Sequence, residues 1–464
     1  MTYAFLLDAS ACSGCKACQV ACKDKNKLPL GVLWRRVYEV SGGAWKREGA
    51  AWSNTLFAYN LSLSCNHCVH PKCAGVCPVD AYSVREDGIV ILDSSKCTGC
   101  GYCAWACPYD APQYDSAAGH MTKCNFCYDN LELGLAPACV SACPLRVLEY
   151  AEVNDGQTLA PGQVALWETP PAAHPYPMPN NSSTRPHLAI KPHAAMNSTE
   201  ARQTANHEEV YPQRASGWDE APLVGFTLLV QMAVGAFWAM LWLFHEPQPQ
   251  LLSLLLIGLF LGAGLVTSFA HLGTKRNAWR MLNHLRKSWL SRELLFTILF
   301  GAGWLATLTG AIARINISPL QWLTALVGLG LIHSMAQVYR LRTVPAWNSW
   351  RTPARFYTSA ALLGILGMVP VLIWSGVETL PWTGTGLLVI LLLSVEAVSA
   401  GGLPLSIARR GLQLGLILAG MIGCATLLFV PGWFSMTTSL LLLLIVLTEQ
   451  VVGRCFFYQA RTRP

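Results

Sequence analysis

Sixteen of the eighteen cysteines in this 464-residue chain lie between Cys12 and Cys143, and they fall into four groups of four. The first group is the stretch CSGCKACQVAC, which places four thiols within eleven residues. Thiols at such short, regular spacings are typical of metal ligands. The four groups are Cys12, Cys15, Cys18, Cys22; Cys65, Cys68, Cys73, Cys77; Cys97, Cys100, Cys103, Cys107; and Cys124, Cys127, Cys139, Cys143.

The spacing within the groups indicates iron-sulfur clusters. The first and third groups follow the pattern C-x2-C-x2-C-x3-C of bacterial ferredoxins, and three of the four groups end in Cys-Pro. Small residues such as Gly14 and Gly99 let three thiols wrap one cubane cluster, while the fourth binds a neighbouring cluster. Sixteen thiolates therefore suffice for four [4Fe-4S] clusters. The spacing leaves open whether the first group pairs with the second or with the fourth.

Zinc and disulfides are the alternatives for these cysteines. Isolated pairs such as Cys65 and Cys68 would suit a zinc ribbon, but four complete groups favour clusters. Disulfides would require an oxidising compartment. The opening MTYAFLLDASAC has no basic region, no apolar core and no twin arginine. We therefore expect the cysteine-rich segment not to be exported by a signal of its own.

The composition divides the chain into three regions. Residues 1–150 are cysteine-rich, with GIVIL at 88–92 expected to form a strand after a turn. Residues 151–221 are rich in proline, which predicts an extended, irregular arm or linker. Residues 222–464 are a series of apolar runs. Charged residues make up only 13% of the whole chain, against about 25% in average soluble proteins.

The charge balance argues for a membrane and against nucleic acid. Residues 1–221 carry 17 Lys and Arg against 21 Asp and Glu, whereas residues 222–464 carry 16 against 5. The basic excess thus belongs to the apolar region, and we expect no nucleic-acid partner. Each apolar run is close to the roughly 20 residues that cross a bilayer as a helix. We predict eight transmembrane helices, at residues 223–244, 251–272, 294–312, 320–339, 356–375, 384–403, 411–430 and 437–453.

Basic residues are concentrated in alternate connections between these helices. Fifteen lie in the second, fourth and sixth loops and in the C-terminal tail, whereas the other loops carry only Arg314. The positive-inside rule then places the cysteine-rich domain on the cytoplasmic side of the bacterial inner membrane. The fifteen are Lys275, Arg276, Arg280, Arg286, Lys287, Arg292, Arg340, Arg342, Arg351, Arg355, Arg409, Arg410, Arg454, Arg461 and Arg463.

Several motifs resemble the dimethyl sulfoxide reductase family. The cysteine pattern, with SCNHC at 64–68, YCAWACPYDAPQY at 102–114 and GHMTKC at 119–124, is similar to the electron-transfer subunit of that enzyme. The apolar region resembles its anchor subunit through HLG at 271–273, SWLSRE at 288–293, TVPAW at 343–347 and EQVVGRCFFY at 449–458. The resemblance implies two subunits fused in one chain. The expected fold is an α+β double ferredoxin-type domain followed by an all-α membrane domain of eight helices.

The resemblance also implies how the cysteines pair. The first and fourth groups would share two clusters, and the second and third groups would share the other two. Because all sixteen positions are cysteine, all four clusters would be [4Fe-4S] centres. The implied ligand sets are Cys12, Cys15, Cys18, Cys143; Cys124, Cys127, Cys139, Cys22; Cys65, Cys68, Cys73, Cys107; and Cys97, Cys100, Cys103, Cys77.

A quinone site would connect these clusters to the membrane. His271 ends the second predicted helix, Glu293 opens the third, and the neighbouring Arg292 could orient Glu293 or a quinone carbonyl. In the resembling anchor the matching His and Glu lie at the quinol site, so menaquinone or ubiquinone is the expected cofactor. No haem is expected, because His333 has no clear partner at equal depth. Ionisable groups near the membrane interior are costly and usually functional.

Three functions follow from these observations. The first is an electron-transfer and anchor subunit that oxidises quinol and serves a separate molybdopterin subunit, which reduces S- or N-oxides such as dimethyl sulfoxide. The second runs electrons in reverse, in a cytoplasm-facing sulfite or other sulfur-compound dehydrogenase that reduces quinone. The familiar reductase faces the periplasm, so the loop charges add weight to this alternative. The third is an ion-pumping or scaffold membrane protein with an attached ferredoxin.

Overall fold

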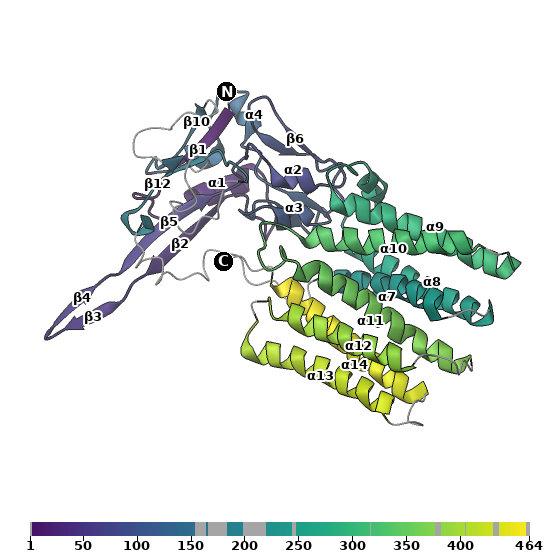
Figure 1. Ribbon diagram of the computed structural model, residues 1–464. Coiled ribbons are helices and arrows are strands. Elements are labelled where there is room, and N and C mark those ends of the chain that lie inside the picture. Colours follow the sequence, from purple (N-terminus) through teal and green to yellow (C-terminus); the bar gives the residue numbers. More distant parts are fainter. Residues whose placement is uncertain are drawn as a thin grey trace. The chain divides into compact units, whose positions relative to one another are not determined.

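The computed structural model describes residues 2–153, 164–165, 183–197, 220–243, 247–315, 317–375, 382–403, 405–429 and 436–460. The chain forms two compact units (Figure 1). We call the unit of residues 1–213 and 273–280 the cluster unit, and that of residues 214–272 and 281–464 the helical unit. The short segment Gly273–Arg280 therefore belongs to the cluster unit, although in sequence it follows the second predicted membrane helix.

A four-stranded sheet forms one side of the cluster unit. Its central strand β1 (Thr2–Asp8) pairs antiparallel with β10 (Leu148–Val153) and parallel with β12 (Leu188–Lys191), and β11 (Val164–Ala165) pairs with β12. Four successive residues of β1, from Ala4 to Leu7, are buried. Both faces of the strand are therefore covered, which explains its continuous apolar sequence.

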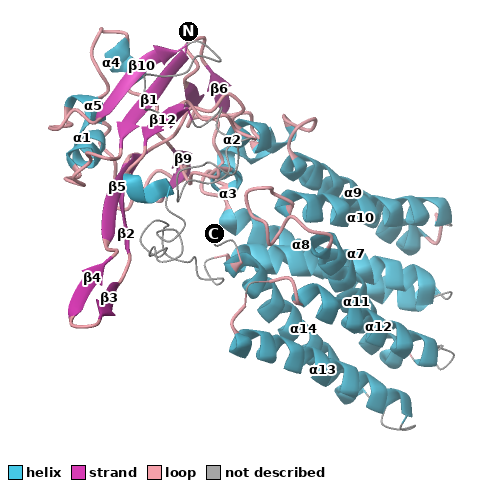
Figure 2. Cartoon of the chain, turned by 60° about the vertical axis from the view of Figure 1, so that its left-hand side comes forward, coloured by secondary structure: helices cyan, strands magenta, loops and turns pink. Residues whose placement is uncertain are grey.

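The other strands of the cluster unit form hairpins. Strand β2 (Arg36–Gly42) pairs with β5 (Phe57–Leu63), and β3 (Trp45–Glu48) pairs with β4 (Ala51–Asn54). Together they form the long projecting hairpin in Figures 1 and 2. The predicted strand at 88–92 is confirmed as β7. The remaining elements are β6 (Tyr82–Val84), β7 (Val90–Leu92), β8 (Gln113–Asp115), β9 (His120–Thr122), α1 (Ala17–Lys25), α2 (Lys72–Val76), α3 (Tyr102–Ala106), α4 (Tyr128–Leu131), α5 (Ala138–Ser141), η2 (Ala194–Asn197) and η3 (Lys275–Leu282).

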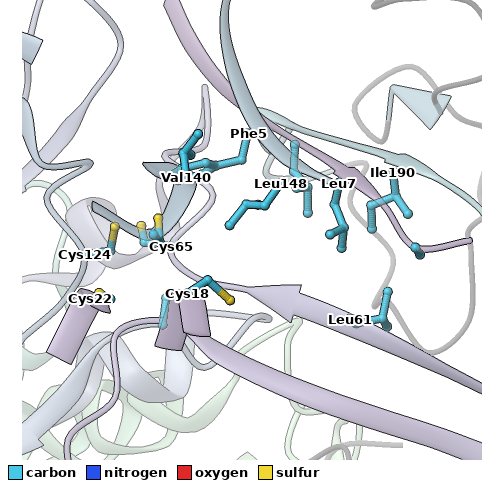
Figure 3. Close-up of a cluster of buried hydrophobic side chains, with 14 of the residues drawn as sticks. Phe5, Leu7, Cys18, Cys22, Leu61, Cys65, Cys124, Val140, Leu148 and Ile190 are labelled. Atoms are coloured by element: carbon cyan, nitrogen blue, oxygen red, sulfur yellow. The ribbon is translucent and has the colours of Figure 1, made fainter. Parts of the chain in front are cut away.

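Cysteines take part in the core of the cluster unit. Phe5, Leu7 and Leu148 of the sheet pack in one buried cluster with Cys18 and Cys22 of α1 (Figure 3). Most of the predicted proline-rich arm lies outside the described residues. Within its described part, β12 is a regular strand rather than irregular chain, because its alternate apolar side chains extend the sheet core.

The helical unit consists, over its described residues, of long helices that lie alongside one another (Figure 1). Seven of them are long and apolar enough to cross a membrane, and the apolar part of α12 (Gly384–Ala400) is shorter. The helices are α7 (Ala221–Leu243), α8 (Pro247–His271), α9 (Trp289–Ala313), α10 (Ser318–Tyr339), α11 (Arg351–Trp374), α12 (Trp382–Ala400), α13 (Ile407–Phe429) and α14 (Met436–Gln459).

The helices begin before the apolar runs that predict them, and the difference is largest, five residues, in two of them. Helix α9 starts at Trp289 rather than at 294, so Glu293 lies inside it, and α11 starts at Arg351 rather than at 356. The prediction counted apolar residues, but backbone hydrogen bonds continue a helix through a polar first turn. Arg355 and Arg454, counted above as loop and tail charges, are buried within helices, which leaves thirteen of the fifteen.

Candidate functional site: four thiol quartets

The four cysteine loops share one turn. In each Cys-x-x-Cys the residue before the second cysteine has a positive φ, a region that favours glycine. Glycine occupies this position in two loops, and the other two contain His67 and Phe126, which sequence reasoning did not single out. The angles are 69° at Gly14, 42° at His67, 74° at Gly99 and 61° at Phe126.

This turn aims backbone N–H groups at the first thiol of the loop. The N–H of Gly99 donates to Cys97 Sγ at 3.3 Å, and that of Phe126 donates to Cys124 Sγ at 3.3 Å. The N–H of Met121 reaches Cys97 Sγ at 3.4 Å from a neighbouring strand. Such donors stabilise a thiolate, the form that binds metal.

The first two implied ligand sets combine the outer cysteine groups. One pocket is lined by Cys12, Cys15, Cys18 and Cys143, although Cys143 is far from the other three in sequence. Helix α1, which carries Cys18 and Cys22, packs on α5, which carries Cys139. Burial, followed by the nearby thiols of Cys139 and Cys127, raises the pKa of Cys22 to about 12. The first and fourth groups are thus interleaved.

The inner cysteine groups are interleaved in the same way. A second pocket is lined by Cys65, Cys68, Cys73 and Cys107. Helix α2 packs on α3, and these helices carry one cysteine from each group. Burial raises the pKa of Cys100 to about 12, and this thiol also interacts electrostatically with Cys77 and Cys97.

We call each of the four implied ligand sets a quartet and number the quartets in the order given above. Neighbouring quartets approach one another through particular thiols. Cys18 interacts electrostatically with Cys139, Cys124 with Cys65, and Cys103 with Cys73. Figure 3 shows Cys65 and Cys124 close together at the edge of the core. Combined with the implied ligand sets, these three proximities would order the quartets in one row, from the quartet of Cys12 to that of Cys97.

The thiol arrangement fits iron-sulfur clusters. All eighteen cysteines are free of disulfides, and no three Cys, His, Asp or Glu side chains in the described part of the chain are placed to hold a single metal ion. Zinc would need its four thiolates at about 2.3 Å. Four thiols that line one pocket, three of them from a single loop, suit a cubane, whose irons would supply one-electron redox chemistry. The individual ligand sets stay predictions.

The segment Gly273–Arg280 binds the loop of Cys97. The N–H of Thr274 donates to the carbonyl oxygen of Thr98 at 3.0 Å, and Asn277 Nδ2 donates to that of Cys97 at 3.0 Å. Gly273 lies so close to Gly119 that a Cβ there would be 2.1 Å from the Gly119 oxygen. One end of the row is therefore held by the segment that begins two residues after His271.

The predicted quinone residues lie at the helix ends beside this segment in sequence. His271 ends α8, and its side chain lies outside the described part. Glu293 is buried in α9 and forms no ion pair within the described structure. Arg292 Nε donates to the Leu285 oxygen at 2.8 Å, and its guanidinium lies 4.2 Å from the centre of the Trp289 ring. These contacts give Arg292 a part in fixing the loop before α9.

The two units together define a class: an iron-sulfur electron-transfer domain joined to a membrane anchor. The sequence model of one protein family, the 4Fe-4S dicluster domain, matches residues 56–153. That of a second family, the dimethyl sulfoxide reductase anchor subunit, matches residues 214–406. The protein belongs to the dimethyl sulfoxide reductase family, with the iron-sulfur and anchor subunits fused in one polypeptide.

Three curated proteins illustrate the range of relatives. A chain of the anaerobic dimethyl sulfoxide reductase of Escherichia coli (strain K12) is 44% identical over 192 residues, which are 41% of this chain and 89% of that protein. A subunit of the tetrathionate reductase of Salmonella typhimurium is 43% identical over 143 residues, 30% of this chain and 54% of that protein. The formate dehydrogenase iron-sulfur subunit of Wolinella succinogenes is 37% identical over 166 residues, 31% of this chain and 78% of that protein.

Proposed function

We propose that this chain carries electrons from a membrane quinol to a separate molybdopterin subunit, which reduces an S- or N-oxide such as dimethyl sulfoxide. The observation that carries the proposal is the single row of four thiol quartets, one end of which binds the segment after His271. The sixteen cysteines would hold four [4Fe-4S] clusters in the nested sets, each of which accepts and passes on one electron at a time.

The residues at the helix ends would accept the protons that the quinol releases. Oxidation of a quinol releases two protons and two electrons. Glu293, buried without a cation beside it in the described structure, is suited to accept a proton, and His271 is the proposed second acceptor. Arg292 would hold the loop that precedes Glu293, through the Leu285 carbonyl. The bound species would be menaquinone or ubiquinone.

The membrane arrangement is part of the proposal. Eight crossings, with α12 as the sixth, would place both chain termini on one side of the membrane. Thirteen basic residues on that side, none of them among the buried residues of the described structure, against Arg314 on the other, support a cytoplasmic cluster unit in the inner membrane. A reporter fused after Pro464 should be active only in its cytoplasmic form, and activity of a periplasmic reporter would contradict this orientation.

Electron flow in the reverse direction, from a sulfur-compound dehydrogenase to quinone, has less support. Of the three relatives above, the one that matches over the longest stretch comes from a dimethyl sulfoxide reductase, and a second comes from a tetrathionate reductase. The attached-scaffold alternative would leave the row of quartets without a catalytic partner. Purification of the intact complex tests this point, because a molybdenum-containing subunit should accompany the chain.

Substitutions at the helix ends test the quinone site. His271→Ala and Glu293→Gln should each abolish quinol-dependent reduction by the complex, because a proton acceptor is lost. Turnover with a reduced dye that donates directly to the clusters should survive and serves as the internal control. Quinol activity that persists in both variants would remove these residues from the site.

A further inference from the structure

Two basic side chains are buried in the cluster unit without a carboxylate beside them. Arg35 is 1% exposed and Lys123 is 4% exposed, and neither forms an ion pair within the described part of the chain. A buried charge is costly unless an opposite charge compensates it. The burial of these cations therefore points to a nearby anionic group other than a carboxylate.

Lys123 lies at the third quartet of the row. It lines the same pocket as Cys65, Cys68, Cys73 and Cys107. Its Nζ donates to the carbonyl oxygens of Val90 and, at 2.7 Å, of Cys124. These bonds fix the ammonium group at the wall of the pocket, and its charge acts on the Cys73 thiol.

Arg35 lies between the first two quartets. Its guanidinium donates to the Ser62 carbonyl oxygen at 3.1 Å and to Ser64 Oγ at 2.9 Å, and lies 4.4 Å from the centre of the Phe5 ring. These contacts fix the guanidinium, and its charge acts on thiols of both quartets. The thiols are those of Cys139, Cys124, Cys18 and Cys22.

The quartet of Cys97 differs from the other three. Within the described structure no buried Lys or Arg faces its thiols, and the charged residue that acts on Cys77 is the acidic Asp80. Lys96, which precedes Cys97 as Lys123 precedes Cys124, has a side chain 47% exposed to solvent, and its Nζ lies 3.6 Å from Asp93 Oδ2. Water and Asp93 therefore screen the Lys96 charge.

We propose that Lys123 and Arg35 are the fixed counter-ions of the clusters in the first three quartets and raise their reduction potentials above that of the Cys97 cluster. The inference rests on the proposed function, because it requires four clusters. Four thiolates make a cluster anionic, and each reduction adds one electron and no proton. A fixed cation in a low-dielectric interior therefore stabilises the reduced form more than the oxidised form.

The test is a redox titration of the purified membrane complex, in which electron paramagnetic resonance follows each cluster. We expect Lys123→Met to shift one cluster to a more negative potential. At the wild-type midpoint of that cluster, its ratio of reduced to oxidised form should fall by about tenfold or more, given the strength of a buried charge interaction. Lys123→Arg should keep the wild-type potential.

Lys96→Met is the matched control, since it removes the same charge at the same distance in sequence from a cluster cysteine. All four potentials should stay unchanged in this variant. A purely structural Lys123, needed only to bind the Val90 and Cys124 carbonyls, would alter stability without moving one potential selectively. Unchanged potentials in a fully loaded Lys123→Met complex would overturn the proposal.

Arg35 provides a second, independent pair of variants in case Lys123→Met assembles poorly. Arg35→Lys should preserve the potentials of the first two clusters, and Arg35→Met should lower at least one of them. Equal potentials in both Arg35 variants would overturn the proposal. The wild-type titration separates the two levels of inference, because fewer than four clusters there would count against the proposed function itself.

Discussion

The cluster unit and the helical unit treat buried charge in opposite ways. The buried ionic residues of the cluster unit in its described part are two cations, Arg35 and Lys123, and no Asp or Glu. Among its described residues the helical unit buries two arginines and three carboxylates, and Arg355 Nε lies 3.0 Å from Glu396 Oε1. The helical unit thus supplies carboxylate counter-ions, whereas the described cluster unit has none for its two buried cations.

The surplus in each unit agrees with the function proposed for it. Two buried cations without carboxylate partners, among sixteen thiols, suit anionic clusters. Burial of these cations would be unfavourable without a nearby negative charge. The third carboxylate of the helical unit, Glu293, stands apart from the network around Glu396 and Glu449 and has no buried cation paired with it in the described structure. A group that exchanges protons with a quinol needs such freedom from a permanent ion pair.

The largest expected effect comes from removing a cluster. Cys143→Ser should reduce the iron content from about sixteen to about twelve per chain, because each cubane contains four irons and needs four ligands. Iron analysis and electron paramagnetic resonance measure the loss. If the nested sets are right, Cys12→Ser removes the same signal as Cys143→Ser. Different missing signals in the two variants would favour adjacent pairing instead, and Cys424→Ser, outside the four groups, should leave the iron content unchanged.

The ion pair of the helical unit should rank second. Glu396→Ala leaves Arg355 buried without its partner, which we expect to destabilise the unit by about 3–5 kcal/mol. The loss also removes the acceptor of Thr358 Oγ1, which donates to Glu396 Oε2 at 2.9 Å. Unfolding of the purified protein in detergent measures the change. The double variant Arg355→Met, Glu396→Leu should recover much of the stability, and equal instability of the double variant would show that charge balance is not the cause.

A methyl group at Gly273 probes the segment that binds the cluster loop. Gly273→Ala would drive Cβ toward the Gly119 oxygen, and the strain of fitting it should cost about 1–3 kcal/mol. Displacement of Thr274 and Asn277 from the Cys97 loop should lower quinol-dependent turnover more than dye-dependent turnover. Gly262→Ala in α8 is the control, since its Cβ meets no atom within 4 Å. Equal turnover in both variants would show that the tight contact is dispensable.

The sequence reveals the ligands of the cluster unit better than it reveals their surroundings. Cysteine spacing predicts the four groups because three thiols of each cubane come from one short loop. The positive φ of His67 and Phe126 follows from the same loop geometry, but neither residue type signals it as glycine does. Arg35 and Lys123 look like ordinary surface charges in the sequence, because their burial depends on contacts between residues far apart in the chain.

In the helical unit the sequence predicts the elements well but not the contacts of their charged side chains. Apolar runs locate each helix well, because a membrane span must be long and apolar. They misplace charges near helix ends: the apolar runs assign Arg355 to a loop and Arg454 to the tail, but both are buried within helices. Arg454 donates to Gln231 Oε1 at 3.0 Å, a contact across more than two hundred residues. A hydropathy pattern contains no information about such a pairing.

The smallest effect should come from an exposed ion pair of the cluster unit, which sets the scale for charge screened by water. Lys191 Nζ lies 2.8 Å from Asp8 Oδ2 and ties β12 to β1. Burial alone would raise the pKa of Asp8, but the bonds from Lys191 and Ser10 outweigh it and hold the pKa below its usual value. Because the pKa of Asp8 is lower in the folded state than in the unfolded state, where it is near 4, the ion pair stabilises the fold at higher pH. This contribution disappears as the pH falls through the folded-state pKa. Lys191→Met should therefore cost at most about 1 kcal/mol at pH 7, with a smaller difference from wild type at pH 3, in unfolding measurements at both pH values. A loss as large as that of Glu396→Ala would contradict the distinction between screened and buried charge on which the comparison of the two units depends.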